Sequence, residues 1–406
     1  MKTRAFAFAL IGALYFTQGI PLGLAMEALP GLLRQQGAPL DRLAFLPLVG
    51  LPWVLKFLWA PLVDDRWSPR LGRRRSWVLP MQGLVLLCLL AAAALGLSAD
   101  TAGMAVALFA VASLASATQD TATDGLAAER FAGPDLARAN GLQVAGTMTG
   151  FFFGGSGCLT IAGLFGTRAA LLSVASVVAA GLLLALLWRE PAAAAAPRGG
   201  ASLGGFLRRP GSLRLLAVAL LSAVTASAGF GLWKLFLLDS GWSLAEVGRL
   251  GLASGAVTVA LGCGGGAWLV GRLGAWPVLA LGLAASLSAA AGWGAQALGM
   301  ASATWVAGLA AGLGAAGTGA ASVAAMALAM GFAARAGQAG TDMTAVQSTR
   351  DLGEIGTSAA VTGLAAGLGY GTAFAGMGAA ALLALAAVAA AHRTAPLRSA
   401  GEELRA

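Results

Sequence analysis

LPWVLKFLWAPLVDDRWSPRLGRRRSW, residues 51–77, is the stretch that decides the fold of this chain. An apolar run ends at Asp64 and Asp65, five arginines follow within ten residues, and a second apolar run begins at Trp77. Because charges at this density are costly in hydrocarbon, we predict a short connection between two membrane helices. Arginine-rich connections stay on the cytoplasmic side, so this one also sets the orientation of the chain.

The composition of the 406-residue chain is that of a membrane protein. Hydrophobic residues make up 58% and charged residues 11%, with a mean hydropathy of +0.80, whereas soluble domains carry about 25% charged residues. Repeated apolar runs of roughly 20 residues are long enough to cross a bilayer. The sequence therefore predicts an all-α polytopic membrane protein.

Several other classes of function are not indicated. The net charge of +9 comes from arginines between apolar runs, and no polar domain is available to hold nucleic acid. The three cysteines lie far apart inside apolar runs, and the single histidine has no acidic or cysteine cluster beside it. We therefore expect no disulfide framework, metal site or cofactor. Without a histidine in any predicted span, we do not expect a membrane enzyme.

Twelve membrane spans are predicted, in two sets of six. The first set covers about 5–30, 42–63, 77–97, 101–128, 138–164 and 168–188, and the second about 213–238, 244–270, 275–297, 301–331, 341–368 and 370–391. Prolines, an alanine run and arginines interrupt the apolar pattern between the sets. We predict an N-terminal bundle (1–188), a cytoplasmic linker (189–212), a C-terminal bundle (213–392) and a cytoplasmic tail (393–406).

The distribution of positive charge predicts a multi-pass topology with both termini in the cytoplasm. Of the 26 lysines and arginines, 19 lie in the termini, the linker and the even-numbered connections. Three arginines, at positions 34, 42 and 168, lie on the opposite side. Cytoplasmic segments carry the excess of such residues, and the asymmetry decides the orientation.

The predicted eleventh span has the highest density of charge at membrane depth. Gln347, Arg350 and Glu354 share one helix face, and Asp351 flanks it. A guanidinium stays charged and binds carboxylates bidentately, so Arg350 is a candidate for substrate binding or coupling. The alternative is an Arg350–Glu354 pair that only locks helix packing. Lys234 lies near the end of its span; it could attract an anionic substrate, but we expect its amine to reach the membrane surface.

The predicted fourth span carries Asp120 and Asp124 one turn apart. Two neighbouring carboxylates in a low dielectric do not both ionise cheaply, so we expect one to hold a proton near neutral pH. That property suits a proton-coupled carrier. The alternative is a structural pair bonded to Lys56 or to arginines of the connection.

Polar residues also mark the first and fifth spans. Asn140 and Gln143 lie on one stripe of the fifth span, either facing a cavity or bonding a neighbouring helix. Tyr15 and Gln18 lie in the first span, where proline and glycine weaken the helix, as in broken helices that border transport sites. Glu27, near the outer end, is interpreted as a gate carboxylate or as a residue that reaches the interface.

The opening stretch resembles the signature of the major facilitator superfamily between its second and third helices, here PLVDDRxxxRLGRRR. By this resemblance Asp64 or Asp65 is the acidic residue of a gating loop, and the insertion at 67–69 leaves the choice between them open. The basic end of the loop is Gly72, Arg73 and Arg74. The match of Gln143 to Gln347 and of GAPL at 37 to GWSL at 241, both offset by 204, is typical of two similar six-helix bundles.

Residues 11–130 resemble one branch of that superfamily through LYFTQGIPLG, LPWVLKFLWAPLVD and TQDTATD. The branch holds AmpG-type muropeptide permeases, acetyl-CoA transporters and RhtX/FptX-type siderophore importers, and ALPGLLRQQGAPL is most similar to the last. The resemblance implies a secondary active transporter of the bacterial inner membrane. Its cargo would be a pyochelin- or rhizobactin-like siderophore, iron-loaded or free, imported by proton symport with alternating access. The alternative is a muropeptide permease.

The same resemblance assigns partners and roles. Arg350 would hold the anionic cargo, while Glu354, Asp351 or the Asp120 and Asp124 pair would pass the proton. The expected partners are a siderophore, protons and membrane lipid, and a monomer is expected.

Overall fold

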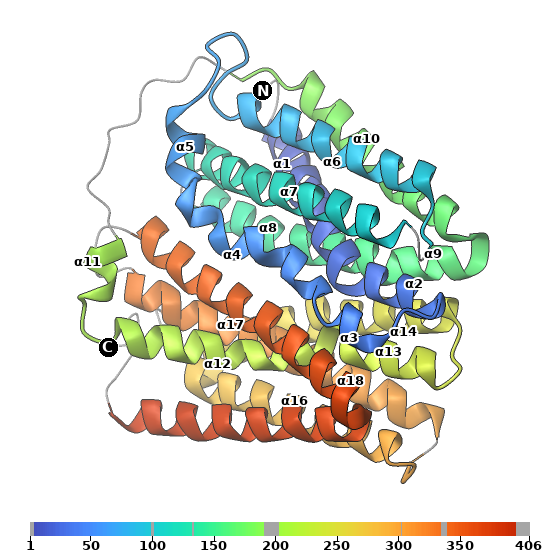
Figure 1. Ribbon diagram of the computed structural model, residues 1–406. Helices are drawn as coiled ribbons and strands as arrows, with labels where there is room; N and C mark the ends of the chain where they lie inside the picture. The colour runs from blue at the N-terminus through green and yellow to red at the C-terminus, as the bar shows by residue number, and fades with distance from the viewer. Residues whose placement is uncertain are drawn as a thin grey trace. The chain divides into compact units, whose positions relative to one another are not determined.

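The computed structural model describes residues 4–98, 101–131, 134–190, 203–301, 303–333 and 339–394. Within these ranges the chain is helical apart from turns, short connections and one isolated bridge between Ser68 and Gly72, and Figure 1 labels most of the helices. Nine helical segments in the described residues are long and apolar enough to cross a membrane. The prediction of an all-α membrane protein is therefore confirmed, while the count of twelve spans stays a prediction.

The chain divides into two compact units, which in described residues are 4–38, 49–190 and 240–252, and 39–48, 203–239 and 253–394. The first unit begins with α1 (Arg4–Gly23), the π-helical stretch η1 (Leu24–Ala28) and α2 (Leu29–Gln35). It continues with α4 (Leu51–Leu55), the 3-10 turn η3 (Lys56–Leu58), α5 (Ala60–Asp65), α6 (Arg75–Leu95) and α7 (Ala102–Arg130). It then has α8 (Pro134–Phe152), the π-helical stretch η4 (Phe153–Gly157), α9 (Cys158–Phe165) and α10 (Thr167–Leu187).

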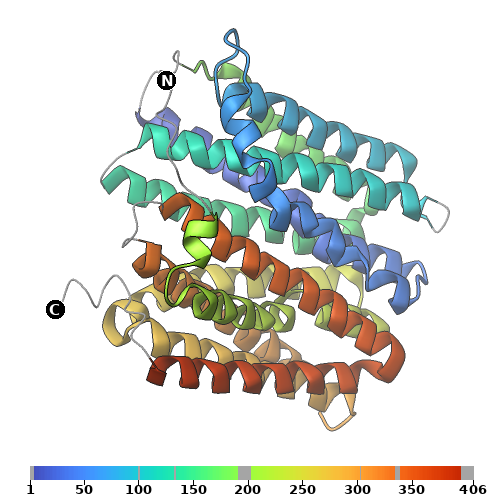
Figure 2. The ribbon, with the colours of Figure 1, turned by 60° about the vertical axis from the view of Figure 1, so that its left-hand side comes forward.

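The second unit includes α3 (Leu40–Leu43), α11 (Leu203–Leu207), α12 (Ser212–Phe230) and α13 (Leu232–Asp239). Its later helices are α15 (Gly266–Leu273), α16 (Ala275–Ala297), α17 (Thr304–Ala333) and α18 (Ala339–Thr394). The 3-10 turn η2 (Leu46–Gly50) and α14 (Leu244–Val257) cross unit boundaries, and the π-helical stretch η5 (Thr258–Gly265) follows α14. Figure 2 shows α18 folding back on itself, because Gly369 has a φ of 81° that only glycine adopts readily.

Residues 42–63, the predicted second span, do not form one continuous helix in the structure, and their crossing of the membrane stays a prediction. The segment is divided into α3, η2, α4, η3 and α5. Pro52 and Pro61 lie in the first turns of α4 and α5, where a missing backbone N–H costs least, and the residue before a proline disfavours the helical conformation, which favours a break before each. The interruption places Lys56 in a short 3-10 turn.

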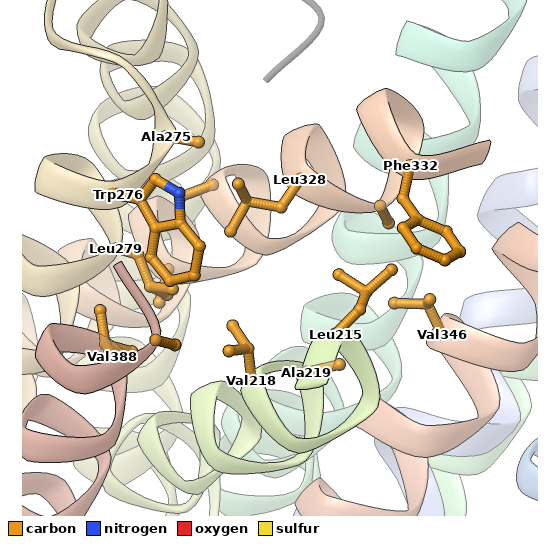
Figure 3. Packing of buried hydrophobic residues seen from close by; sticks show 14 of the residues in the cluster. Leu215, Val218, Ala219, Ala275, Trp276, Leu279, Leu328, Phe332, Val346 and Val388 are labelled. Atoms are coloured by element: carbon orange, nitrogen blue, oxygen red, sulfur yellow. The ribbon is translucent and has the colours of Figure 1, made fainter. Parts of the chain in front are cut away.

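Small residues allow the helices of each unit to approach closely. In the first unit, a Cβ on Gly150 of α8 would overlap the carbonyl oxygen of Phe16 in α1, and one on Gly23 would overlap that of Phe151. In the second unit, side chains from α12, α16, α17 and α18 converge on a core that includes Leu215, as Figure 3 shows. Close backbone contact through glycine is the packing typical of membrane helices.

The described end of the predicted linker is anchored on the second unit. Phe206 of α11 is buried against Phe332. The guanidinium of Arg209 lies 4.0 Å from the centre of the Phe332 ring and forms a 2.6 Å ion pair with Asp342. Arg209 also donates to the Phe332 carbonyl oxygen at 3.1 Å. Linker residues 191–202 and tail residues 395–406 lie outside the described part of the chain.

Candidate functional site

A buried polar cluster connects α1, η3 and α7 in the first unit. Lys56 of η3 forms an ion pair with Oδ2 of Asp120 in α7, and Gln18 of α1 donates from Nε2 to the other carboxylate oxygen at 2.5 Å. Lys56 is 7% exposed, Asp120 4% and Gln18 1%. This is the arrangement expected by the structural interpretation of Asp120, and it pairs one buried cation with one buried anion.

Asp124 lies one turn further along α7 and has different partners. Its Oδ1 accepts hydrogen bonds from the Tyr15 hydroxyl at 2.9 Å and from Nε2 of Gln143 at 2.7 Å. Both donors are neutral, whereas Asp120 is paired with a cation. The structure therefore brings together five residues predicted separately in three spans, with Lys56 as a sixth; we call them the carboxylate cluster: Tyr15, Gln18, Lys56, Asp120, Asp124 and Gln143.

The cluster retains hydrogen-bonding capacity that the protein does not use. Among the residues that the structure describes, Oε1 of Gln18 and Nε1 of Trp53 are buried and have no hydrogen-bond partner. The Lys56 ammonium lies 5.1 Å from the centre of the Trp53 ring. Buried polar atoms are nearly always bonded, so an acceptor and a donor left unpaired around one ion pair indicate a place where another polar group can bind.

α1 and α7 are held in register beside this cluster. Ser116 donates to the backbone carbonyl of Gln18 at 2.5 Å, and Trp59 donates from Nε1 to Thr118 at 3.1 Å. Serine and threonine on α7 thus act as small polar contacts where a helix meets its neighbours. The side chain of Asn140 lies outside the described residues, so its predicted role stays a prediction.

Glu27 lies apart from the carboxylate cluster, in the π-helical stretch η1. Its carboxylate accepts a 2.7 Å hydrogen bond from Ser156 of η4 and packs against Gly155. The residue is 2% exposed, so the interpretation that it reaches the interface is wrong; the two helices enclose it. Single π-turns are frequent at functional sites, and the gate role of Glu27 stays a prediction.

In the second unit, Arg350 has two side-chain partners. One guanidinium nitrogen lies 2.7 Å from Glu354 Oε1 and 2.8 Å from the Ser322 hydroxyl. The internal pair named as the alternative is therefore formed. Nε of Arg350 is buried and has no hydrogen-bond partner within the described ranges. Gln347 and Asp351 are half-buried on the same helix. The transport roles of these four residues stay predictions.

The expectation for Lys234 is wrong. The residue is 2% exposed, and its ammonium lies 5.2 Å from the centre of the Trp233 ring. Trp233 stacks on Trp293 at 5.4 Å, and Phe236 meets Trp293 edge-on. Lys234 is therefore buried beside Trp233, which its position near a span end does not reveal.

The basic end of the gating loop contacts acids that sequence reasoning missed. Arg73 and Arg74 pair with Glu129 at 3.0 and 2.6 Å, and the Glu190 carboxylate accepts from the backbone N–H groups of Arg74 and Arg75 at 2.8–3.0 Å. Glu129 directly follows the predicted fourth span and Glu190 follows the sixth, both on the predicted cytoplasmic side. Because both glutamates lie on the arginine-rich side of the predicted topology, the sequence could have indicated them as partners of the loop arginines.

Other parts of this loop are only partly described. Gly72 has a φ of 101°, and a Cβ there would lie 2.6 Å from Glu190 Oε2, so glycine is required on both counts. The side chains of Asp64 and Asp65 lie outside the described residues. The gating roles of all five predicted loop residues stay predictions.

Comparison with known proteins places these features among transporters. The family model described as acetyl-coenzyme A transporter 1 matches residues 7–163, which include the whole carboxylate cluster. The anhydromuropeptide permease of Escherichia coli K12 is 32% identical over 154 residues, which is 38% of this chain and 31% of the permease. An uncharacterized membrane protein of Saccharomyces cerevisiae is 40% identical over 77 residues, covering 18% of this chain and 14% of that protein. The chain thus matches less than a third of the length of these two relatives.

Solved structures match over nearly the full chain. A D-xylose–proton symporter has a TM-score of 0.73 at 13% identity, with 98% of this chain and 99% of that one covered. A bacterial homologue of the human lysosomal transporter Spinster, in an inward-facing and occupied conformation, has a TM-score of 0.63 at 18% identity, with 96% of both covered. The chain has the fold of major facilitator transporters.

Proposed function

We propose that this chain is a secondary transporter that carries anhydromuropeptides, or cargo with the same anionic peptide chemistry, across the bacterial inner membrane into the cytoplasm. The observation that carries this proposal is the buried Lys56–Asp120 pair with its unpaired neighbours Gln18 and Trp53. Ionisable groups at membrane depth are expensive and serve as substrate or ion sites in transporters.

The choice of cargo departs from the siderophore expected on sequence resemblance. A permease for anhydromuropeptides and the acetyl-coenzyme A transporter family are two matches whose descriptions name a cargo. These matches favour the muropeptide alternative over siderophore import. Peptide-bearing muropeptides and acetyl-CoA share anionic groups, which is the chemistry that a buried lysine attracts.

The carboxylate cluster supplies three kinds of contact for such a cargo. The Lys56 ammonium attracts a carboxylate, the Trp53 indole N–H is available to donate, and the Gln18 amide oxygen is available to accept. Alternating access would expose this cluster to each side of the membrane in turn.

The test is uptake of radiolabelled anhydromuropeptide by right-side-out inner-membrane vesicles from a strain without its own muropeptide permease. We expect saturable uptake that depends on the expressed protein and that excess ferric siderophore leaves unchanged. Lys56→Gln should reduce uptake at least about tenfold, because a charge-assisted contact is worth about 1.5–3 kcal/mol. Arg168→Gln removes an exposed cation of the same unit and should leave uptake unchanged.

Two results would overturn this proposal. The first is anhydromuropeptide uptake equal to that of vesicles without the protein. The second is protein-dependent accumulation of a ferric siderophore that anhydromuropeptide does not compete, which would restore the siderophore assignment. Uptake of acetyl-CoA by the same vesicles tests whether the cargo is instead that of the acetyl-coenzyme A transporter family.

A further inference from the structure

We propose that the connection between α5 and α6 binds the headgroups of anionic phospholipids through four side chains that we call the loop face: Arg66, Trp67, Arg70 and Leu71. The partner is the phosphate layer of the membrane on the predicted cytoplasmic side. This binding site is separate from cargo transport. Its test uses no cargo, so the two proposals can fail independently.

The backbone of this connection is closed by hydrogen bonds of its own. The Ser68 carbonyl oxygen accepts from the Gly72 backbone N–H at 3.0 Å. The Ser76 hydroxyl donates to the Gly72 carbonyl oxygen at 2.5 Å and accepts from the Ser68 backbone N–H at 2.9 Å. The Trp77 indole N–H donates to the Arg66 carbonyl oxygen at 2.6 Å. The loop is therefore an ordered support for the side chains that it exposes.

The five arginines of the connection divide into two groups by their partners. Those at 73–75 bond to Glu129 or to the Leu186 carbonyl oxygen, all within the first unit. Arg66 and Arg70 are exposed, and neither has an acidic partner among the described side chains. One group thus holds the loop on the protein, and the other extends toward the surroundings.

The acids near the loop do not lie on the loop face where they are described. Glu129 contacts two arginines of the inner group, and Glu190 accepts from backbone N–H groups at the start of α6. Residues 66–75 contain five arginines and no acid. Asp64 and Asp65 precede this range, and their side chains lie outside the described residues. The two exposed guanidiniums are therefore placed to bind phosphate, which arginine does bidentately.

Two apolar side chains accompany these arginines. Trp67 is 38% exposed and Leu71 is 40% exposed. Tryptophan is enriched where membrane meets water, because its ring is apolar and its N–H is polar. The apolar span of α6 begins at Arg75, and Figures 1 and 2 show the connection extending past that end of the helix. This position corresponds to headgroup depth.

The combination favours a membrane surface over a soluble protein as the partner. Segments that lie in the interface pair arginine or lysine with tryptophan or leucine, and anionic headgroups attract the cations. The loop is also joined directly to an apolar helix, so its side chains stay at the surface of the bilayer. Residues 67–69 are an insertion relative to the superfamily signature, so the loop face belongs to this chain rather than to the signature.

The experiment titrates the purified full-length protein in dodecyl maltoside with a short-chain phosphatidylglycerol brominated in its acyl chains. Bromine quenches tryptophan fluorescence on contact, and the part of the quenching that Trp67→Phe removes reports lipid at the loop face. We expect this part to saturate in the native protein. Arg66→Gln/Arg70→Gln should weaken its apparent affinity by about thirtyfold, or about fivefold for each arginine near the surface.

A matched control separates the loop face from the net charge of the protein. Arg42→Gln/Arg168→Gln also removes two exposed arginines, on the predicted opposite side, and should leave the Trp67-dependent affinity unchanged. Brominated phosphatidylcholine, whose headgroup carries no net charge, should bind at least about tenfold more weakly than phosphatidylglycerol. Glycerol phosphate should not displace the lipid at equal concentration, because it makes no apolar contact with Trp67 or Leu71.

The native protein also supplies a test if the double arginine variant does not fold. Raising the sodium chloride concentration should weaken phosphatidylglycerol binding at the loop face, because salt screens contacts between exposed charges. Phosphatidylcholine binding should change little. Phosphatidylglycerol binding that does not respond to salt would contradict an electrostatic contact and overturn the proposal.

Four further results would overturn it. The first is equal Trp67-dependent affinity for the two lipids, and the second is native affinity in Arg66→Gln/Arg70→Gln. The third is equal weakening in Arg42→Gln/Arg168→Gln, which would assign the effect to net charge. The fourth is absence of Trp67-dependent quenching by either lipid, which would place the loop face away from the bilayer and make a protein partner the better assignment.

Discussion

Replacing Gly282 with alanine is expected to destabilise the second unit through the contact between α16 and α17. A Cβ on Gly282 would lie 2.7 Å from the Gly317 carbonyl oxygen, 2.8 Å from the Ala321 nitrogen and 3.0 Å from the Ala321 Cβ. Ordinary van der Waals contact begins at 3.4 Å, so the helices must separate by about 0.7 Å. Two of the three atoms belong to the backbone and cannot rotate away.

The size of the effect follows from two opposing terms. Overpacking in a rigid interior costs about 1–3 kcal/mol, while alanine is a better helix former than glycine by about 1 kcal/mol. Because the obstruction is backbone, we expect a cost near the upper end and a net loss of about 1–2 kcal/mol. Gly294→Ala in the same helix meets only the Phe374 Cβ, at 3.8 Å, and should be neutral or stabilising by up to about 1 kcal/mol.

Thermal unfolding of the purified variants in one detergent, followed by circular dichroism, measures the difference. The midpoint of Gly282→Ala should fall by a few degrees, and that of Gly294→Ala should stay or rise. Gly317→Ala obstructs the same crossing from the other side, with its Cβ 2.6 Å from the Gly282 carbonyl oxygen, so the double variant should lose less than the two single losses combined. Equal midpoints for Gly282→Ala and Gly294→Ala would refute the reasoning.

Three further predictions concern single polar contacts. Glu190→Gln removes the charge of a carboxylate that accepts from the backbone N–H groups of Arg74 and Arg75. We expect the free energy of unfolding to fall by about 0.5–2 kcal/mol and trypsin to cleave faster within 66–75. Unchanged cleavage would contradict this prediction. Arg209→Met removes the ion pair between Arg209 and the buried Asp342 and should lower the unfolding midpoint. The double variant Arg209→Met/Asp342→Asn should recover part of that loss. A double variant less stable than Arg209→Met would contradict this prediction. Arg350→Ala should reduce cargo uptake at least about tenfold in a well-inserted protein, whereas normal uptake would restrict the Arg350–Glu354 pair to packing.

The positions of the membrane helices and the polar residues on each helix face could be predicted from local sequence, because both depend on residues close together in the chain. The charge density between Asp64 and Arg75 marked a connection outside the bilayer, and the long apolar runs marked the helices. Spacing along one helix placed Asp120 and Asp124 on a common face. The same spacing placed Arg350 within reach of Glu354, and the structure forms that bond.

The contacts between helices could not be derived in this way, because they depend on which faces meet. Gln18 and Lys56 reach Asp120 across sequence separations of 102 and 64 residues, and no periodicity specifies that meeting. Periodicity also does not specify that the Glu190 carboxylate accepts from backbone N–H groups at the start of α6. Nor does it specify that Lys234 is buried beside Trp233. Local sequence determined the helices and the polar groups they carry, since both follow from neighbours along the chain. Only tertiary packing decided which charge faces which partner, because close contact between glycine-rich helices brings together residues that are distant in sequence.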